Sequence, residues 1–457
     1  AHWAYNVLGW GGYWGWDPVE NASLMPWLTG TAFLHSVMMQ EKRGMMKSWN
    51  VWLIFSTFML TILGTLLTRS GIISSVHAFA SSDIGNWFYG FILIVFAVCL
   101  LTFFKQRDHL KSENKLESIV SRESSFLFNN LILLAACFTI LWGTLFPILS
   151  EYVQGSKVTV GAPFYNRVNI PIGLFLIFLT GIGPLLAWRS TSLRSIRRNF
   201  ILPTAAFFIM LIVLLVFVDQ PWKDGDGMES TIFSLMAFSL AAGVITAIVA
   251  EFLRGANVVR TQTRKNLFAS TLLLIRRNTR RYGGYIVHFG IVVMFIGIAG
   301  GAFNQSHEQE MGFGDTLQLG PFRLVCQSYT QDSNANFDTE YALLDVYKGS
   351  SSKKITQLTP ELRFYHASQT QATMVANRST LASDLYVIYE GKNPDTDKPI
   401  IKAFINPLMA WIWIGVVIIV IGTFVALVPN LAKSPSNTAP ARVVLDEPEL
   451  EPEVHHA

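Results

Sequence analysis

Residues 10–40 read WGGYWGWDPVENASLMPWLTGTAFLHSVMMQ, in which an aromatic, glycine-rich segment passes directly into an apolar one. The apolar part is long enough to cross a hydrocarbon core of about 30 Å as a helix. Similar runs recur along the chain, and we expect nine membrane spans, at residues 22–40, 49–68, 86–104, 126–149, 168–188, 200–218, 230–253, 284–303 and 404–428. These runs predict a polytopic α-helical membrane protein.

The amino-acid composition agrees with this fold class. Of the 457 residues, 51% are hydrophobic and only 14% are charged, whereas soluble domains are about 25% charged. The three cysteines form no CxxC or CxxCH motif, which excludes a c-type cytochrome and argues against dithiol chemistry by this chain. The net charge of +4 is small and unevenly placed, and we expect no nucleic-acid partner.

Basic residues alternate between the connections of the predicted spans. The connections after the first, third, fifth and seventh spans are rich in Lys and Arg, and the connections between them are poor in both. Cytoplasmic loops carry the excess of Lys and Arg in membrane proteins. The aromatic segment is therefore predicted to face outward, and the C-terminus to lie in the cytoplasm.

The polar segments divide the chain into predicted domains. Residues 1–303 form the membrane core, with the aromatic segment in residues 1–28. Residues 304–402 alternate like strands in DTLQLG, FRLVCQSY, EYALLDVYKG, KKITQL and DLYVIYEG, and predict an outer β domain that is a barrel or a sandwich. Residues 403–429 form the last span, and the acidic, Pro-rich residues 430–457 are expected to be disordered.

Two histidines lie inside predicted spans, where ionisable residues are costly and usually functional. His35 lies seven residues before Lys42, and His288 lies seven residues after Arg281. Both are therefore roughly 10 Å above the inner boundary of the membrane. Two histidines at one depth on two helices predict the two axial ligands of one haem iron. The alternative is that each histidine forms a hydrogen bond with a neighbouring helix separately.

The aromatic segment has features that a membrane-interface belt of Trp and Tyr does not explain. Its glycines would let a planar ligand approach the backbone closely. Asp17 and Glu20 serve either in a binding site or as caps of the helix that begins at Pro18. A flat, apolar ligand with anionic groups fits this surface, and haem meets that description. The residues predicted to form the external haem site are His77, Trp10, Trp14, Trp16 and Asp17, with Arg69, Gly11, Gly12, Tyr13, Trp27 and Glu20 as further haem contacts.

The stretch WGGYWGWDPVENASLMPWL closely resembles the tryptophan-rich WWD signature of haem-handling proteins of cytochrome c biogenesis. The stretches GTAFLHS, LGTLLTRSGIISSVHAFAS, GGYIVHFGIVV and NPLMAWIWIGVVIIVIG extend the resemblance to the cytochrome c maturation protein F family. Members of that family are haem lyase subunits of the bacterial system I pathway. The resemblance covers nearly the whole chain apart from the tail.

The resemblance implies a role for each matching residue. His35 and His288 match the ligands of a resident b-type haem, and His77 matches the second of two external histidines that hold the incoming haem. The first external histidine precedes the WWD segment in the family. This chain lacks that sequence, so we expect it to be a fragment or part of a split protein.

The resemblance also implies partners and a location. Haem would arrive from a periplasmic haem chaperone of the CcmE type, and a thiol-presenting subunit of the CcmH type would supply the CxxCH of apocytochrome c. The resident haem would carry electrons, with quinol as a candidate reductant. The protein would act as an enzyme within a complex in the bacterial inner membrane, with the WWD segment and the β domain in the periplasm.

Three other interpretations remain open from the sequence. The chain would also fit the related lyase subunit that serves a nitrite reductase cytochrome. A haem transporter would need a continuous polar path across the membrane, and the spans contain no run of ionisable residues to line one. A docking scaffold for haem and apocytochrome would tolerate replacement of His35.

Overall fold

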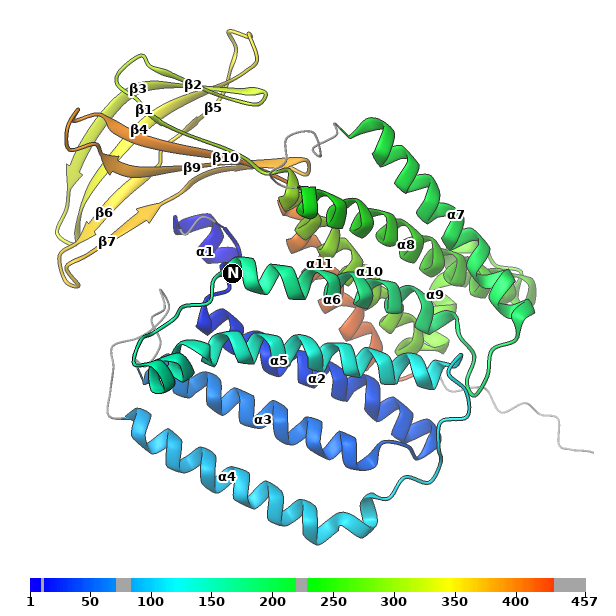
Figure 1. The fold of residues 1–457 in the computed structure, drawn as a ribbon. Helices are drawn as coiled ribbons and strands as arrows, with labels where there is room; N and C mark the ends of the chain where they lie inside the picture. The colour runs from blue at the N-terminus through cyan, green and yellow to red at the C-terminus, as the bar shows by residue number, and fades with distance from the viewer. Residues whose placement is uncertain (10–11, 71–83, 219–227, 431–457) are drawn as a thin grey trace, which may run out of the picture.

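The computed structural model describes residues 1–9, 12–70, 84–218 and 228–430, and it consists of a bundle of long helices beside a β domain (Figure 1). The helices are α1 (His2–Val7), α2 (Pro18–Arg43), α3 (Lys47–Arg69), α4 (Ile84–Gln106), α5 (Arg122–Gln154), α6 (Ala162–Ile182), α7 (Leu193–Phe217), α8 (Met228–Thr263), α9 (Leu267–Arg277), α10 (Thr279–Gly300) and α11 (Met409–Leu427). Short 3-10 turns follow α4, α6 and α10.

Eight helices of the described chain are long and apolar enough to cross a membrane, and they correspond to eight of the nine predicted spans. The remaining span lies in α2, whose polar residues Asn21, Thr29 and Ser36 lower its hydropathy. These three side chains are all buried, and the 26 residues of α2 would rise roughly 39 Å. The polytopic helical fold is confirmed, and α2 belongs to the same bundle, packed against α3 and α5.

The helices pack as two groups. One group contains α2, α3, α4 and α5, and the other contains α7, α8, α9, α10 and α11. The helix α6 contacts α5 on one side and α8 on the other, so it joins the two groups. The short helix α9 lies in a connection for which no helix was expected.

Glycines bring α10 and α11 into backbone contact. A Cβ atom at Gly290 would lie 2.8 Å from the carbonyl oxygen of Gly415, and one at Gly422 would lie 2.7 Å from the backbone nitrogen of Val287. The glycines of α10 recur every seven residues, at positions 283, 290 and 297, which keeps them on one face of the helix. Small residues at such positions let membrane helices approach closely. We call this contact the glycine seam.

The β domain is a pair of packed antiparallel sheets. One sheet has the strand order β1 (Gln305–Glu310), β10 (Pro399–Pro407), β9 (Ser383–Lys392) and β8 (Ala376–Ser379). The other has the order β2 (Thr316–Leu319), β3 (Phe322–Ser333), β4 (Phe337–Lys348), β6 (Glu361–Tyr365) and β7 (Thr370–Met374), and β5 (Lys354–Leu358) pairs with β4. The predicted β domain before the last helix is confirmed as a sandwich.

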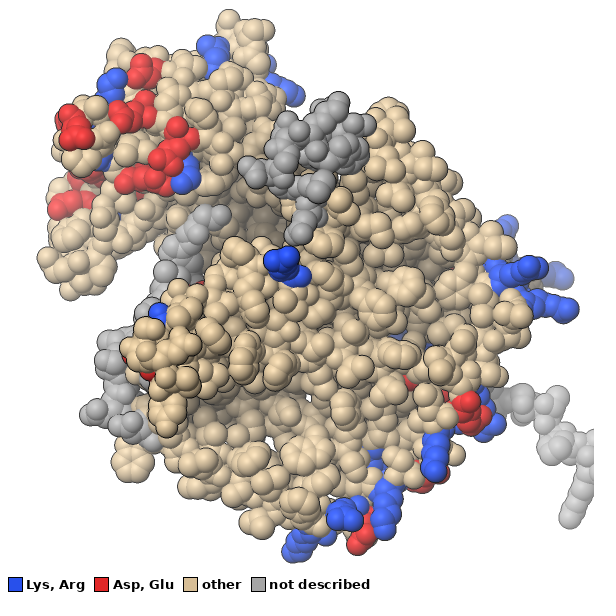
Figure 2. All heavy atoms as spheres, in the orientation of Figure 1, with Lys and Arg blue, Asp and Glu red and all other residues tan. Residues whose placement is uncertain are grey.

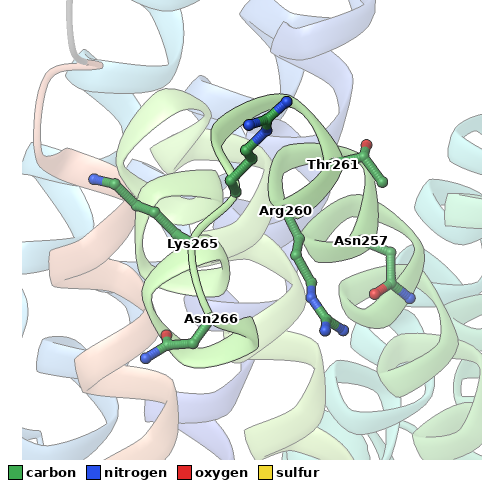
Figure 3. A pocket seen from close by; sticks show the side chains of 6 residues that line it. Asn257, Arg260, Thr261, Lys265 and Asn266 are labelled. Carbon is green, nitrogen blue, oxygen red and sulfur yellow. The ribbon is translucent and has the colours of Figure 1, made fainter.

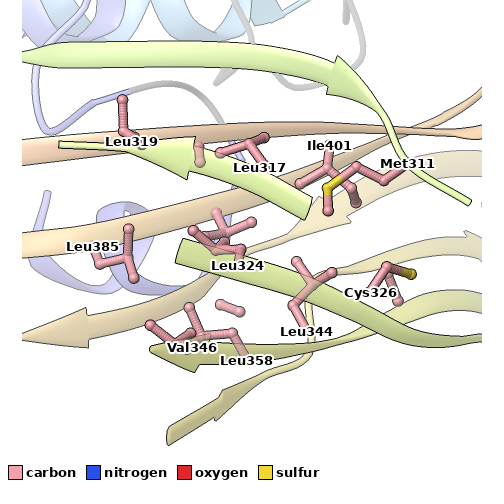
Figure 4. Packing of buried hydrophobic residues seen from close by; sticks show 14 of the residues in the cluster. Met311, Leu317, Leu319, Leu324, Cys326, Leu344, Val346, Leu358, Leu385 and Ile401 are labelled. Carbon is pink, nitrogen blue, oxygen red and sulfur yellow. The ribbon is translucent and has the colours of Figure 1, made fainter. Parts of the chain in front are cut away.

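The two sheets enclose one apolar core. Leu317, Leu324 and Leu344 from the larger sheet are fully buried against Ile401 and other residues of the smaller sheet (Figure 4). The last predicted span started at residue 404, but β10 continues to Pro407, because Phe404 still pairs with a residue of β9. The helix α11 begins only at Met409.

The N-terminal helix α1 is held by the β domain. The backbone nitrogen of Gly9 donates to the carbonyl oxygen of Thr373 over 2.9 Å. The Tyr5 hydroxyl donates to the Asp384 carboxylate over 3.2 Å, and both side chains are buried. Burial raises the pKa of the Asp384 carboxyl above its usual range. The segment just before the aromatic stretch is therefore attached to the β domain.

The glycine seam generates a stability prediction. Replacing Gly290 with Leu would place a side chain against the backbone of α11, and over-packing of this kind costs about 1–3 kcal/mol. We expect a thermal unfolding midpoint several degrees lower for the detergent-solubilised protein. The matched control is Gly90→Leu on α4, because a Cβ atom at Gly90 meets nothing within 4 Å. Equal midpoints for the two variants would contradict the proposed role of the seam.

Candidate functional site

The structure brings together the two histidines that were expected at one depth. The ring centroids of His35 on α2 and His288 on α10 lie 6.2 Å apart, and the ring planes differ by only 12°. The helix α2 belongs to one group of helices and α10 to the other. The two rings therefore meet where the two halves of the bundle face each other.

The ring nitrogens of these histidines have different surroundings. Nδ1 of His35 donates to the carbonyl oxygen of Thr31 over 2.8 Å, since a carbonyl can only accept. This contact leaves Nε2 of His35 with its lone pair, as in most histidine ligands of metals. Nδ1 of His288 is buried and has no hydrogen-bond partner among the described residues. Phe126 of α5 packs beside His35 at a centroid distance of 5.8 Å.

A cluster of charged side chains lies toward the basic end of α10 from His288. Arg281 forms an ion pair with Glu251 of α8, and its Nε donates to the Tyr285 hydroxyl over 3.3 Å. Arg254 also pairs with Glu251, over 3.1 Å. Arg122 of α5 interacts with Tyr285, Arg281 and Glu251. Two of these arginines pair with Glu251 and the third lies near it, so this arginine cluster carries two unbalanced positive charges.

The predictions from the sequence missed this cluster. Arg281 and His288 are seven residues apart, which places them on nearly the same face of α10, two turns from each other. The same seven-residue spacing had served in the sequence only to estimate the depth of His288 in the membrane. It also indicates that Arg281 and His288 lie on the same side of α10.

Asp17 and Glu20 cap the helix α2. The backbone nitrogen of Val19 donates to Asp17 over 2.9 Å, and the backbone nitrogens of Gly15 and Asp17 donate to Glu20 over 2.8 and 3.2 Å. This reciprocal arrangement is a capping box, which satisfies backbone donors that a helix start leaves free. Of the two roles left open for these carboxylates, the structure gives both of them the capping role.

Trp16 points into the bundle. Its ring stacks on Tyr165 of α6 at a centroid distance of 4.9 Å, and its Nε1 donates to Asn166 over 2.8 Å. Its backbone φ of 56° lies in the left-handed region, which bulky residues rarely adopt. Trp14 contacts the edge of Trp16 at 5.8 Å. Trp16 therefore anchors the aromatic segment to α6.

The other described residues of the predicted external site differ in their exposure. Trp27, on α2, is 50% exposed. Tyr13 packs against the cluster of α1, β9 and α11, and burial raises its pKa to about 12. A Cβ atom at Gly12 would meet nothing within 4 Å, so the backbone there is open to a close approach.

Arg69 is the last residue of α3 and is exposed. It lies at the same end of the bundle as the aromatic segment, because Gly64 of α3 contacts Ala22 near the start of α2. Trp10, Gly11 and His77 lie outside the described residues.

Comparisons with known proteins connect this geometry to a family. The family model described as "Cytochrome C assembly protein" matches residues 1–73, and the one described as "CcmF C-terminal beta-sandwich" matches residues 302–407. The "Cytochrome c-type biogenesis protein CcmF" of Pseudomonas aeruginosa is 34% identical over 418 residues, which are 90% of this chain and 60% of that protein. The chain belongs to the CcmF family.

Two further relatives agree with this assignment. The CcmF of Escherichia coli K12 is 32% identical over 96% of this chain and 65% of its own length. The solved structure named "Cytochrome c Heme Lyase CcmF" matches with a TM-score of 0.70 and 25% identity, over 94% of this chain and 62% of that one. The chain thus spans about three fifths of the length of the CcmF relatives that it matches.

The capping box of α2 can be tested separately from any ligand. Asp17→Ala removes the side-chain acceptor and should lower the free energy of unfolding by about 0.5–2 kcal/mol. Asp17→Asn should leave it almost unchanged, because Asn caps helices as well as Asp does. Thermal unfolding of the two purified variants measures the difference. A loss of stability as large for Asn as for Ala would show that the charge, and not the cap, is what α2 needs.

Proposed function

We propose that this chain carries the haem-handling part of a haem lyase of cytochrome c biogenesis. In this proposal, haem received from a periplasmic chaperone of the CcmE type is joined by thioether bonds to the CxxCH of apocytochrome c. The observation that carries the proposal is the facing pair of His35 and His288 within a CcmF-family bundle.

The histidine pair fits a resident haem. Two imidazoles that ligate one metal through bonds of about 2.0–2.1 Å hold their ring centroids roughly 6 Å apart, and the observed distance is 6.2 Å. The nearly parallel rings and the free Nε2 of His35 support the same assignment. The buried Nδ1 of His288 without a partner marks the place as one that a ligand would complete. A bound haem would supply a one-electron redox centre there.

The arginine cluster suits the propionates of this haem. Haem carries two carboxylates, and the cluster of Arg122, Arg254 and Arg281 with Glu251 has two unbalanced positive charges. Arginine binds carboxylates in a planar, paired geometry. Arg281 and His288 share one face of α10, so we assign the propionates to the arginine side of the histidine pair. The role of these residues is to bind and orient the haem.

The external site lies at the opposite end of the helices. Here Trp14 and Trp27, with Trp10, Gly11 and Gly12, would offer a flat apolar surface to the incoming haem, and His77 would ligate its iron. Asp17 and Glu20 would act by holding the segment to α2, and Arg69 by pairing with a propionate. The thiols would come from apocytochrome c, presented by a partner subunit of the CcmH type, because this chain has no paired cysteines.

The distribution of charge supports an orientation in the bacterial inner membrane. Most Lys and Arg side chains gather at the end of the bundle away from the β domain (Figure 2). Since cytoplasmic loops carry such an excess, we place that end in the cytoplasm, and the aromatic segment and β domain in the periplasm. The resident haem then lies closer to the cytoplasmic side, where quinol in the bilayer would be a suitable reductant.

The histidine assignments predict two distinct phenotypes. His35→Ala and His288→Ala should each abolish the b-type absorbance of the purified protein, because each would remove one of the two residues that hold the haem. His77→Ala should keep that absorbance but block cytochrome c maturation in cells. The optical spectrum of each variant, oxidised and then reduced, measures the first effect, and the yield of holocytochrome c measures the second.

The control for these variants is His307→Ala in the β domain, since His307 lies on the exposed part of β1. It should change neither the spectrum nor maturation. A normal bis-histidine spectrum in His35→Ala would rule out the resident haem at this pair.

The propionate assignment predicts a change of redox potential. Ferric haem has one positive charge more than ferrous haem, so a nearby cation favours the ferrous form. Arg281→Gln should therefore lower the midpoint potential, on the order of tens of millivolts, where about 59 mV is a tenfold change for a one-electron couple. Arg281→Lys should restore most of the potential, because it keeps the charge. Potentiometric titration of the bound haem measures these values.

The matched control is Arg276→Gln on the exposed side of α9. It removes the same charge from the same end of the bundle without touching the cluster. If Arg276→Gln and Arg281→Gln shifted the potential equally, the effect would be a general one of net charge, and the propionate assignment would be wrong.

A further inference from the structure

The turn between α8 and α9 forms a basic cavity. Its volume is about 600 Å³, and Figure 3 shows the side chains that line it: Asn257, Arg260, Thr261, Arg264, Lys265 and Asn266. Arg264 adopts a φ of 55°, in the left-handed region, and its backbone nitrogen donates to the carbonyl oxygen of Arg260 over 2.8 Å. This hydrogen bond ends α8. Arg260, Arg264 and Lys265 all line the cavity, with Arg260 and Lys265 pointing in different directions (Figure 3). The lining includes no carboxylate.

The cations of this cavity differ from their neighbours in the sequence. Arg254, Arg280 and Arg281 each pair with a glutamate. Among the described residues, no acidic side chain forms an ion pair with Arg260, Arg264 or Lys265. A cavity with three such cations and three neutral polar side chains favours an anion with several oxygen acceptors, above all a phosphate group.

Apolar side chains flank the same cavity on both helices. Phe268 of α9 is 81% exposed, Leu272 one turn later is 52% exposed, and Val258 of α8 is 57% exposed. The opposite face of α9 packs into the protein through Ser270 and Leu274. A helix with one apolar exposed face and basic residues at its ends is typical of the membrane interface.

We propose that the turn between α8 and α9 binds an anionic phospholipid. The cavity lined by Arg260, Arg264 and Lys265 receives the headgroup phosphate, and Phe268 and Leu272 contact the acyl chains. The apolar residues favour a lipid over free phosphate, because a free anion would leave them exposed to water. The site lies at the basic end of the bundle, where the membrane interface is expected, and it does not depend on haem binding.

The test uses the whole chain, purified and reconstituted in nanodiscs of phosphatidylcholine with and without phosphatidylglycerol. Native mass spectrometry after release from the nanodiscs measures which lipids stay bound. We expect retention of phosphatidylglycerol in preference to phosphatidylcholine. The double variant Arg260→Gln/Lys265→Gln should bind phosphatidylglycerol roughly 30-fold more weakly, from the loss of two cations near an anionic lipid.

The matched control is Arg276→Gln/Arg277→Gln, which removes the same charge from the other end of α9, outside the cavity. It should keep the preference for phosphatidylglycerol. Phe268→Ser should weaken lipid binding, and it should not change binding of inorganic phosphate, measured by calorimetry. This pair of measurements separates a lipid site from a site for free phosphate.

Several outcomes would overturn the proposal. One is equal retention of the two lipids by the unmodified chain, which needs no variant to fold. Another is an equal loss of binding in the control double variant. A third is tight binding of inorganic phosphate that Phe268→Ser leaves unchanged, with no selectivity among lipids. A fourth is binding of a synthetic peptide of residues 446–453, DEPELEPE, with no binding of lipid. That result would assign the cavity to an acidic segment of the chain itself.

Discussion

The glycine seam between α10 and α11 determines how the rest of the bundle is arranged. Because the two backbones touch at Gly290 and Gly415, α10 cannot rotate about its axis without a clash. At about 100° per residue, His288 lies two residues and roughly 200° from Gly290, so it points away from the seam. The seam thus directs His288 toward His35 of α2, and Arg281 away from α11 toward Glu251 of α8. The same contact fixes α11, and with it the β domain, whose last strand leads directly into that helix.

Much of the fold was predictable from the period and length of apolar runs. The spans of α3 to α8, α10 and α11 can be recognised in the sequence because each is a long apolar run. Five strands of the sandwich can be recognised because apolar and polar residues alternate in them. The sequence was less informative where polar residues are buried by tertiary contacts, as for Asn21 and Thr29 in α2. It also gave no sign of α9, whose basic ends resemble an ordinary cytoplasmic loop. The end of β10 was missed because Phe404 and Ile405 are as apolar as the helix that follows.

The candidate site was predictable in part. The matched depth of His35 and His288 followed from loop charges, and the structure brings these two rings together. The arginine cluster could not be predicted from the sequence, because its members come from three helices and only packing brings them to one carboxylate. The orientation of Trp16 depends on a left-handed backbone and a stack on Tyr165, neither of which has a local sequence signal. The sequence left the role of Asp17 and Glu20 open, because Asp and Glu occur both as helix caps and as ligand-binding carboxylates.

The attachment of α1 to the β domain has a consequence for the order of events during synthesis. Tyr5 and Gly9 are made well before their partners, since Asp384 and Thr373 follow more than 360 residues later in the chain. At about 5–20 residues per second, the ribosome needs roughly 20 to 75 s to reach them. During this interval the aromatic segment has a helix on one side and no anchor on the other. The aromatic segment can therefore be attached to the β domain only after the strands that contain Thr373 and Asp384 are made, so a chain stopped before them would lack this attachment.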